Sequence, residues 1–226
     1  MQLTGLGLYT FSEAARLTGI THQELRRWLR GYDGARGDDP RYAPLWESEL
    51  AQADIDALSF HDLLEVRFVK EFRKLGLSLQ TIRAAAKTAR ELLDSPYPFT
   101  CKEFRTDGET IFGGAIDASE DAELLDLRRR QYVFKRIVHP SLYAGIEFGA
   151  DKRASRWYPI ERSKAVVLDP TLAFGKPVVT SAAVRTDVLH DAWLAEGKDK
   201  RRVARLYEVP LSAVEAAVRY ELKLAA

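Results

Sequence analysis

YTFSEAARLTGITHQELRRWLRGY, residues 9–32, predicts two short helices joined by a tight turn. Thr10 and Thr21 are each followed three residues later by a glutamate. Each threonine can therefore cap the start of a helix while the glutamate caps the threonine's own amide. Gly19 lies between the two helices and supplies the left-handed conformation that so tight a reversal needs. The stretch predicts a helical hairpin near the start of the chain.

The two faces of this hairpin differ in character. The apolar residues expected to pack the helices together are Ala14, Ala15, Leu17, Ile20, Leu25, Trp28 and Leu29. The residues left outward on the second helix are Thr21, His22, Gln23, Arg26, Arg27 and Arg30. This pattern is typical of a helix-turn-helix that places one helix in a DNA major groove. The alternative is an ordinary helical hairpin with a solvated basic face.

The next segment, GYDGARGDDPRYAPLW (residues 31–46), is rich in glycine and proline, which excludes a helix and predicts a hairpin or a long loop. Arg36 and Arg41, with Tyr42, lie where a wing would contact the DNA backbone. A flexible surface loop is the alternative. Two further helices are expected, one from Ser59 with an apolar stripe and one from Ser78 to about Asp94, before Pro96 and Pro98 end the helical half.

Two segments resemble, in order and spacing, the two helix-turn-helix signatures of MerR-type regulators. The first is Gly19-Ile20-Thr21 with Leu25-Arg26, and the second is Leu75-Gly76-Leu77-Ser78-Leu79 with Ile82-Arg83. The resemblance implies a winged helix-turn-helix, with Arg26 on the recognition helix. The chain departs from the family after this point: no long dimerisation helix with an effector loop follows, and metal-ligand cysteines are lacking. We therefore do not expect a metal or drug sensor.

Residues 97–165 are expected to contain a small sheet and one helix. Phe104–Phe112 predicts a hairpin around Asp107-Gly108, and Tyr143–Ile160 a second hairpin around Gly149. The segment from Ser119 to about Val133 predicts an amphipathic helix. Its arginine run at 128–130 is either a nucleic-acid contact or a solvated helix end.

The last segment predicts two short strands followed by three helices, and Val184 is expected in the first of these helices. Within the segment, RVARLYEVPLSAVEAAVRYE is again a helix-turn-helix pattern. Asp169-Pro170 and Gly175-Lys176-Pro177-Val178-Val179 are similar to the small C-terminal domain of unassigned role found in antitoxins of bacterial toxin–antitoxin operons. This chain departs from that family at one turn, where it has Ser181-Ala182-Ala183 in place of Gly-Thr-Arg.

We therefore predict an α+β, mainly α, fold in three parts. These are a MerR-like winged helix-turn-helix at 1–95, a small β-hairpin and helix segment at 96–165, and a C-terminal three-helix, helix-turn-helix-like domain at 166–226. This order resembles the larger VapB-type antitoxins, a likeness that implies a PIN-domain ribonuclease toxin as partner.

Composition narrows the function classes. The net charge is only +1, so nucleic-acid binding would come from a local patch. The chain has a single cysteine and four scattered histidines, and we recognise no nucleophile–base pair or phosphate-binding loop in it. We therefore expect no metal, no cofactor and no enzymatic activity. No apolar run approaches the ~20 residues that span a bilayer, and no signal peptide is recognisable, so a cytoplasmic protein is expected.

We expect an antitoxin that neutralises the toxin and, as a homodimer, represses its own operon. The DNA-binding candidates are Thr21, His22, Arg26, Arg27, Arg30, Arg36 and Arg41. The toxin-binding candidates are Arg219, Tyr220, Leu222 and Lys223, although a frayed helix end is an equal alternative. The dimer-interface candidates are Val184, Val188, Trp193 and Leu206. Alternatively, the basic residues 198–202 make a second DNA contact. The alternative function is a transcriptional regulator whose C-terminal half binds a small molecule or another protein.

Overall fold

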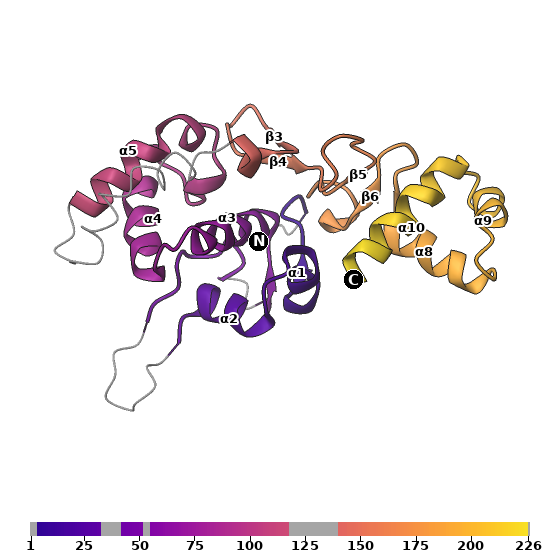
Figure 1. Ribbon diagram of the computed structural model, residues 1–226, viewed down its shortest axis with the longest axis horizontal. Coiled ribbons are helices and arrows are strands. Elements are labelled where there is room, and N and C mark those ends of the chain that lie inside the picture. The colour runs from indigo at the N-terminus through magenta and orange to yellow at the C-terminus, as the bar shows by residue number, and fades with distance from the viewer. Residues whose placement is uncertain (1–3, 33–41, 52–54, 118–139, 226) are drawn as a thin grey trace. The chain divides into compact units, whose positions relative to one another are not determined.

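The computed structural model describes residues 4–32, 42–51, 55–117 and 140–225. Within these ranges the chain forms eight α-helices and three small sheets (Figure 1). The predicted α+β, mainly helical fold class is confirmed. The chain divides into two compact units. We call Thr10–Tyr143 with Phe148–Ala154 the N-terminal unit, and Met1–Tyr9, Ala144–Glu147 and Ser155–Ala226 the C-terminal unit.

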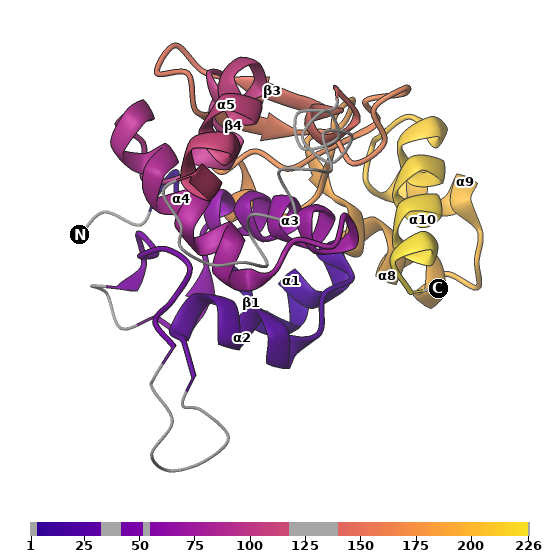
Figure 2. The ribbon, with the colours of Figure 1, turned by 60° about the vertical axis from the view of Figure 1, so that its left-hand side comes forward.

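The N-terminal unit contains five α-helices: α1 (Phe11–Thr18), α2 (His22–Arg30), α3 (Phe60–Lys74), α4 (Leu79–Leu93) and α5 (Phe104–Asp117). Strand β1 (Tyr9–Thr10) pairs with β2 (Ala57–Leu58). Helix α3 lies between the α1–α2 pair and α5 in both views of the ribbon (Figures 1 and 2). Its side chains Leu63, Leu64 and Val69 are completely buried, so α3 forms the centre of this core.

The predicted helical hairpin forms as the sequence indicated. Thr10 Oγ1 accepts the amide of Glu13 at 3.2 Å, and the Thr10 amide donates to Glu13 Oε2 at 2.8 Å. Thr21 and Glu24 form the same reciprocal pair, each bond 3.2 Å long. Gly19 ends α1 in the left-handed region, with φ 64°. Both capping boxes therefore stabilise helices too short to be stable alone.

The hairpin predicted at Phe104–Phe112 is wrong, because this segment lies within α5. Phe104 is completely buried and Ile111, seven residues on, is 3% exposed. A spacing of seven places both side chains on one helical face, which packs on α4 and against Phe99 of the 3-10 helix Pro98–Thr100. Burial of that face outweighs the turn preference of Asp107-Gly108.

The second predicted hairpin is confirmed by the pairing of β3 (Ile146–Phe148) with β4 (Ala154–Trp157). Its turn is closed by the Gly149 amide, which donates to the Arg153 carbonyl at 2.8 Å. The helix predicted between Ser119 and Val133, and the arginine run within it, lie outside the described residues.

The C-terminal unit combines a small sheet with three helices. Strands β5 (Val166–Val167), β6 (Val178–Val179) and β7 (Val184–Arg185) form an antiparallel sheet in which Val179 faces Val166 on one side and Val184 on the other. Helices α8 (Thr186–Ala195), α9 (Lys200–Leu206) and α10 (Leu211–Ala225) follow. Val184, expected in the first of these helices, lies in the strand before it.

The Gly175-Lys176-Pro177 segment receives the start of the chain. The Leu8 amide donates to the Phe174 carbonyl at 2.9 Å, and the Tyr9 hydroxyl donates to the Gly175 carbonyl at 2.5 Å. Gly175 has φ +80°, and a β-carbon there would lie 2.5 Å from the Tyr9 hydroxyl. Glycine is therefore required on two grounds, conformation and space. No helix of the described part of the chain is long and apolar enough to cross a membrane.

Candidate nucleic-acid interface

Helix α2 has one buried and one exposed face. Leu25 is completely buried, and Trp28 and Leu29 are each 5% exposed. The exposed residues of the helix and its cap are Thr21, His22, Gln23, Glu24, Arg26 and Arg27. The predicted separation of an apolar inner face from a polar, arginine-bearing outer face is present in the fold.

Arg26 is held by two groups that lie far from it in sequence. Its guanidinium forms an ion pair with Asp56, which precedes β2. The guanidinium carbon also lies 4.8 Å from the centre of the Phe11 ring at the start of α1. An arginine placed over an aromatic face gains a further favourable interaction. About half of the Arg26 side chain is nevertheless exposed, so this guanidinium is both oriented and accessible.

Arg30 is turned toward the same downstream segment. Its Nη2 donates to the Ile55 carbonyl at 2.9 Å and lies 3.8 Å from Asp56 Oδ1. The Arg30 side chain is 35% exposed, less than that of Arg26. Among the DNA-binding candidates, Arg30 therefore serves to fasten residues 55–56 against α2, whereas Arg26 and Arg27 face outward.

The base of the predicted wing is closed by two tyrosines. Tyr32 and Tyr42 exchange two backbone hydrogen bonds of 3.0 and 2.8 Å, and their rings stack with centres 4.7 Å apart. A β-carbon on Gly31 would lie 2.3 Å from the Tyr42 carbonyl oxygen, so the close approach depends on glycine. The Arg27 guanidinium carbon lies 4.3 Å from the Tyr32 ring centre, which places this arginine beside the wing base. Arg36 and Arg41 lie outside the described residues.

The chain leaving the wing is fastened to the helical core through its backbone. The Leu45 amide donates to the Trp28 carbonyl at 2.8 Å. Arg83 and Arg90 of α4 donate to the carbonyls of Ala43 and Leu45 at 2.9 and 3.1 Å. These side chains supply donors that a loop without strand partners cannot obtain from its own backbone.

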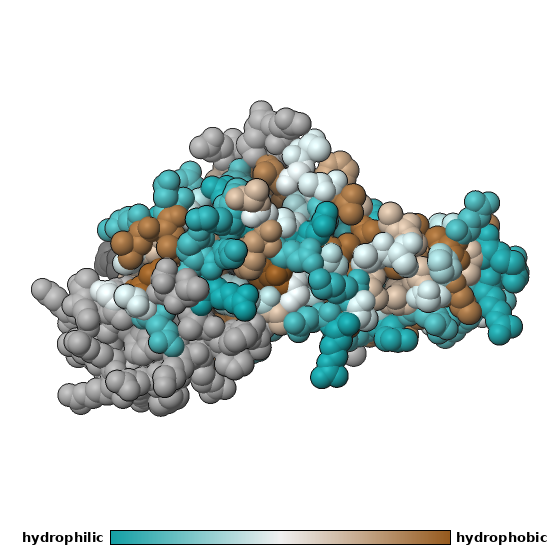
Figure 3. Space-filling model, turned by 90° about the horizontal axis from the view of Figure 1, so that it is seen from above, coloured by the Kyte–Doolittle hydropathy of each residue, from teal (hydrophilic) through white to brown (hydrophobic). Residues whose placement is uncertain are grey.

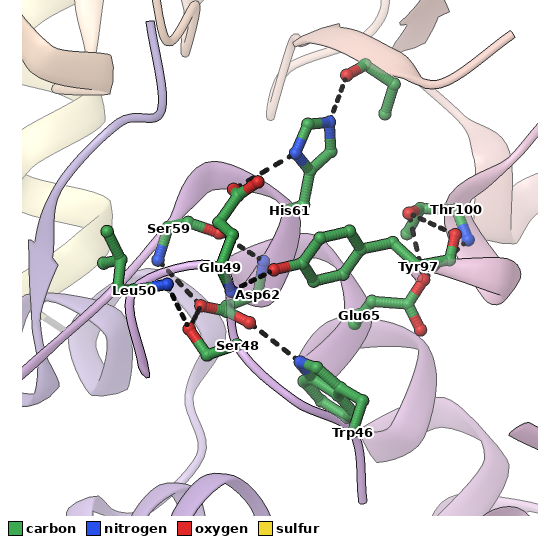
Figure 4. A network of polar contacts seen from close by, with 11 residues as sticks. Trp46, Ser48, Glu49, Leu50, Ser59, His61, Asp62, Glu65, Tyr97 and Thr100 are labelled. Carbon is green, nitrogen blue, oxygen red and sulfur yellow. Dashed lines mark hydrogen bonds and ion pairs between the residues drawn. The ribbon is translucent and has the colours of Figure 1, made fainter. Parts of the chain in front are cut away.

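A buried carboxylate completes this attachment. Asp62 accepts hydrogen bonds from Trp46 Nε1 at 2.8 Å, from Ser48 Oγ at 2.5 Å and from the Ser59 amide at 3.0 Å (Figure 4). It is also the third residue of α3, where it forms a capping box with Ser59. Burial raises the pKa of Asp62, and the hydrogen bonds from Ser48 and Trp46 oppose that rise. The Asp62 side chain thus both completes the capping box of α3 and fixes the segment after the wing base.

Figure 4 shows further ionisable side chains beside Asp62. Glu65 accepts from the Thr100 amide and hydroxyl, each at 3.0 Å, and burial raises its pKa to about 8. The His61 ring nitrogens lie 3.3 Å from Glu49 Oε1 and 3.1 Å from the Ala154 carbonyl. These contacts tie each group to a neighbouring segment of the fold. Among the described residues, no group of three His, Cys, Asp or Glu side chains could hold a metal ion.

Sequence reasoning missed Asp56, Phe11 and Tyr32 as parts of this surface. Phe11 begins α1 and Tyr32 follows α2. An aromatic residue at each end of a hairpin that carries arginines could have indicated the contacts with Arg26 and Arg27. Asp56 lies 30 residues from Arg26 and had no local signal, because only the tertiary fold brings the two side chains together.

The C-terminal candidates lie in varied environments. Arg219, Leu222 and Lys223 are exposed on α10, whereas Tyr220 is 3% exposed. Val184 and Trp193 pack against the apolar cluster of the unit, Val188 is half-buried, and Leu206 is 63% exposed. In the view of Figure 3, hydrophobic and hydrophilic residues are interspersed over the C-terminal helices. Of these eight candidates, Tyr220 contributes mainly to the core, and Arg219, Leu222, Lys223 and Leu206 are the most exposed.

Comparisons with known proteins agree with this architecture. Residues 7–86 match the family described as "Putative DNA-binding HTH domain". The chain is 29% identical over 195 residues to "Putative antitoxin VapB45" of Mycobacterium tuberculosis, covering 80% of this chain and 81% of that protein. It also matches the crystal structure of Rv2018 from Mycobacterium tuberculosis with a TM-score of 0.67 and 24% identity, over 96% of this chain and 100% of that one. The likeness to Rv2018 concerns the fold alone. We conclude that the N-terminal unit carries a helix-turn-helix domain.

Proposed function

We propose that this chain is the antitoxin of a type II toxin–antitoxin pair and that it represses its own operon by binding operator DNA through α2. The observation that carries the DNA-binding part is the outward, oriented pair Arg26 and Arg27 on a short helix whose other face is buried. The match of residues 7–86 to a DNA-binding family supports it. The similarity to a protein named as an antitoxin supports the wider role.

In this proposal α2 enters the major groove with its N-terminal end first, as in other helix-turn-helix proteins. Thr21, His22 and Arg26 would meet base edges, while Arg27 beside the Tyr32–Tyr42 pair would contact the phosphate backbone. The loop between those tyrosines would act as a MerR-like wing, in which Arg36 and Arg41 add backbone contacts. A homodimer would present two α2 helices to half-sites about one helical turn apart.

The toxin in this proposal is a PIN-domain ribonuclease. Such a nuclease holds Mg²⁺ with carboxylates, so a basic side chain or simple occlusion of the pocket suffices for neutralisation. Arg219 and Lys223 are exposed cations on the last helix and are the candidates for this contact. Neutralisation of this kind needs neither a cofactor nor enzymatic activity. Residues 1–95 would thus bind DNA, 96–165 would link, and 166–226 would contact the toxin.

The test is retardation of a labelled duplex from the chain's own upstream region, compared with a scrambled duplex at two salt concentrations. The double substitution Arg26→Ala, Arg27→Ala is expected to weaken operator binding by at least about tenfold, because both groups face the DNA. Arg27→Ala alone should also lower the salt slope by about one. Lys87→Ala is the control, since it removes an exposed charge from α4 and leaves both arginines of α2 in place.

Specific retardation that survives the double substitution would show that α2 does not recognise the operator. Absence of retardation by folded wild-type protein at low salt would overturn DNA binding altogether. The toxin is tested separately, by co-purification with the product of the neighbouring gene and assay of its ribonuclease activity. A regulator without a toxin would bind DNA and leave that activity unchanged.

A further inference from the structure

Two arginines of α2 converge on a single carboxylate, Asp56. Arg26 forms an ion pair with it, and Arg30 lies 3.8 Å from its other oxygen. Arg30 also donates to the Ile55 carbonyl, so the backbone that carries Asp56 is fastened to the helix. The Arg26 guanidinium carbon also lies 4.8 Å from the centre of the Phe11 ring. Arg26 is therefore held between a carboxylate and an aromatic ring.

A carboxylate at this place is unfavourable for binding to DNA as such. The Asp56 side chain is 57% exposed beside the arginines that would approach phosphates, and like charges repel. If the arginines served only to attract the DNA phosphate backbone, a neutral residue at position 56 would bind DNA better. The contribution of Asp56 must therefore lie in something other than overall affinity.

That contribution is the direction of the Arg26 side chain. A free arginine has many rotamers and loses conformational entropy when it is fixed. Base readout needs a fixed guanidinium, because the arginine must present two donors in the plane of a guanine to its O6 and N7 atoms. Guanidinium carries five donor hydrogens, so an ion pair with Asp56 leaves donors for a base. The Phe11 ring limits the tilt of the guanidinium plane.

We infer that Asp56 is a positioning residue that sets sequence selectivity, by holding Arg26 ready to read a guanine in the major groove. The inference rests on the proposed operator binding by α2. Arg30 acts in the same arrangement as a brace for residues 55–56. Asp56 thus lowers the affinity for DNA of any sequence and raises the preference for the operator.

The experiment compares wild-type protein with Asp56→Asn on operator duplex and on a scrambled duplex of the same length. Asp56→Asn is expected to bind the scrambled duplex a few-fold more tightly, because one negative charge is gone. The ratio of operator to scrambled affinity should fall by about tenfold, the discrimination that one bidentate arginine–guanine contact supplies. Glu91→Gln is the charge-matched control, as Glu91 is exposed on α4, and its ratio should stay at the wild-type value.

A second readout separates positioning from general structural damage. Operator guanines are replaced one at a time by 7-deazaguanine, which lacks the N7 acceptor. One position should weaken wild-type binding several-fold yet leave Asp56→Asn and Arg26→Ala nearly unaffected. Asp56→Glu, which keeps the charge, should recover part of the selectivity.

An equal rise in affinity for both duplexes in Asp56→Asn, with the guanine effect retained, would overturn the inference and leave Asp56 as a charge only. A fall in thermal stability with unchanged selectivity would also overturn it, in favour of a structural brace. Equal binding of both duplexes by the wild-type protein would be a different result, because it would contradict the proposed operator binding itself.

Discussion

Both units of this chain contain buried carboxyl groups, but these groups contact different kinds of segment. In the N-terminal unit, Asp62 and Glu65 lie at 0% and 1% exposure and bind segments that have little regular structure. In the C-terminal unit, beside the apolar cluster of α8, α9 and α10, the buried Glu221 of α10 (6% exposed) accepts a hydrogen bond from the hydroxyl of Thr186, the first residue of α8. There the carboxyl group joins two regular helices.

The difference follows from the loop that the N-terminal unit must hold. Residues 43–50 connect the wing base to α3 and lack a partner strand among the described residues. The Trp46 and Ser48 side chains of this segment donate to the buried Asp62 of α3, and the Glu49 amide donates to the Tyr97 hydroxyl. Burial of these polar groups costs desolvation free energy, and their hydrogen bonds fix an irregular segment in one position.

The largest test of this contrast is pH. Because the folded-state pKa of Glu65 is raised to about 8 from its ordinary 4.5, folding takes up a proton between these values. Its contribution to stability is complete below pH 4.5 and is lost as pH rises toward 8. The free energy of unfolding of wild type relative to Glu65→Gln should fall by several kcal/mol between about pH 5 and pH 8. The measurement is urea unfolding at several pH values, and a constant difference would show that Glu65 is ionised in the fold.

The next effect concerns the anchor of the loop after the wing. Asp62→Ala leaves the Trp46, Ser48 and Ser59 donors without their acceptor and removes the aspartate half of the α3 capping box. We expect a loss of about 3 kcal/mol. Hydrogen exchange should quicken in α3 and stay unchanged in α8–α10. Asp62→Asn keeps one acceptor oxygen and should lose less, and an equal loss in both variants would argue that charge, not hydrogen bonding, matters here.

In the C-terminal unit the sensitive point is a turn. Gly175→Ala must accommodate a side chain at φ +80° and a β-carbon 2.5 Å from the Tyr9 hydroxyl. We expect a loss of about 2 kcal/mol. Gly197→Ala is the matched control, because Gly197 also has positive φ (+63°) but nothing lies within 4 Å of the added carbon. Equal losses in thermal unfolding of the two variants would mean that conformation alone decides, without the tyrosine.

The smallest expected effect comes from the partner of that turn. Tyr9→Phe removes the hydrogen bond to the Gly175 carbonyl while it keeps the ring beneath the Lys176 ammonium, 5.7 Å away. The loss should be about 1 kcal/mol. In a double-mutant cycle with Gly175→Ala, the combined loss should be less than the sum of the two single losses. The reason is that Tyr9→Phe also removes the hydroxyl oxygen that would crowd the added β-carbon. Strict additivity would contradict the contact.

Much of the helix-turn-helix could be predicted from the sequence. Both capping boxes, the turn at Gly19 and the division of α2 into buried and exposed faces depend on residues three or four positions apart. The hairpin at β3 and β4 was equally local. The prediction of a hairpin at Asp107-Gly108 was wrong for the same reason. It depended on a local turn signal, whereas the competing burial of the Phe104 face against Phe99 and α4 depends on residues outside the turn.

What the sequence by itself determined is therefore where the short helices begin and which side of α2 faces solvent. Only the tertiary structure decided what holds the outward arginines, what fastens the loop after the wing and why Gly175 must be glycine. Asp56 lies 30 residues from Arg26, Asp62 lies 16 residues from Trp46, and Tyr9 lies 166 residues from Gly175. Caps and helical faces are encoded within one or two turns of chain, whereas these pairs exist only after folding has closed the loops between them.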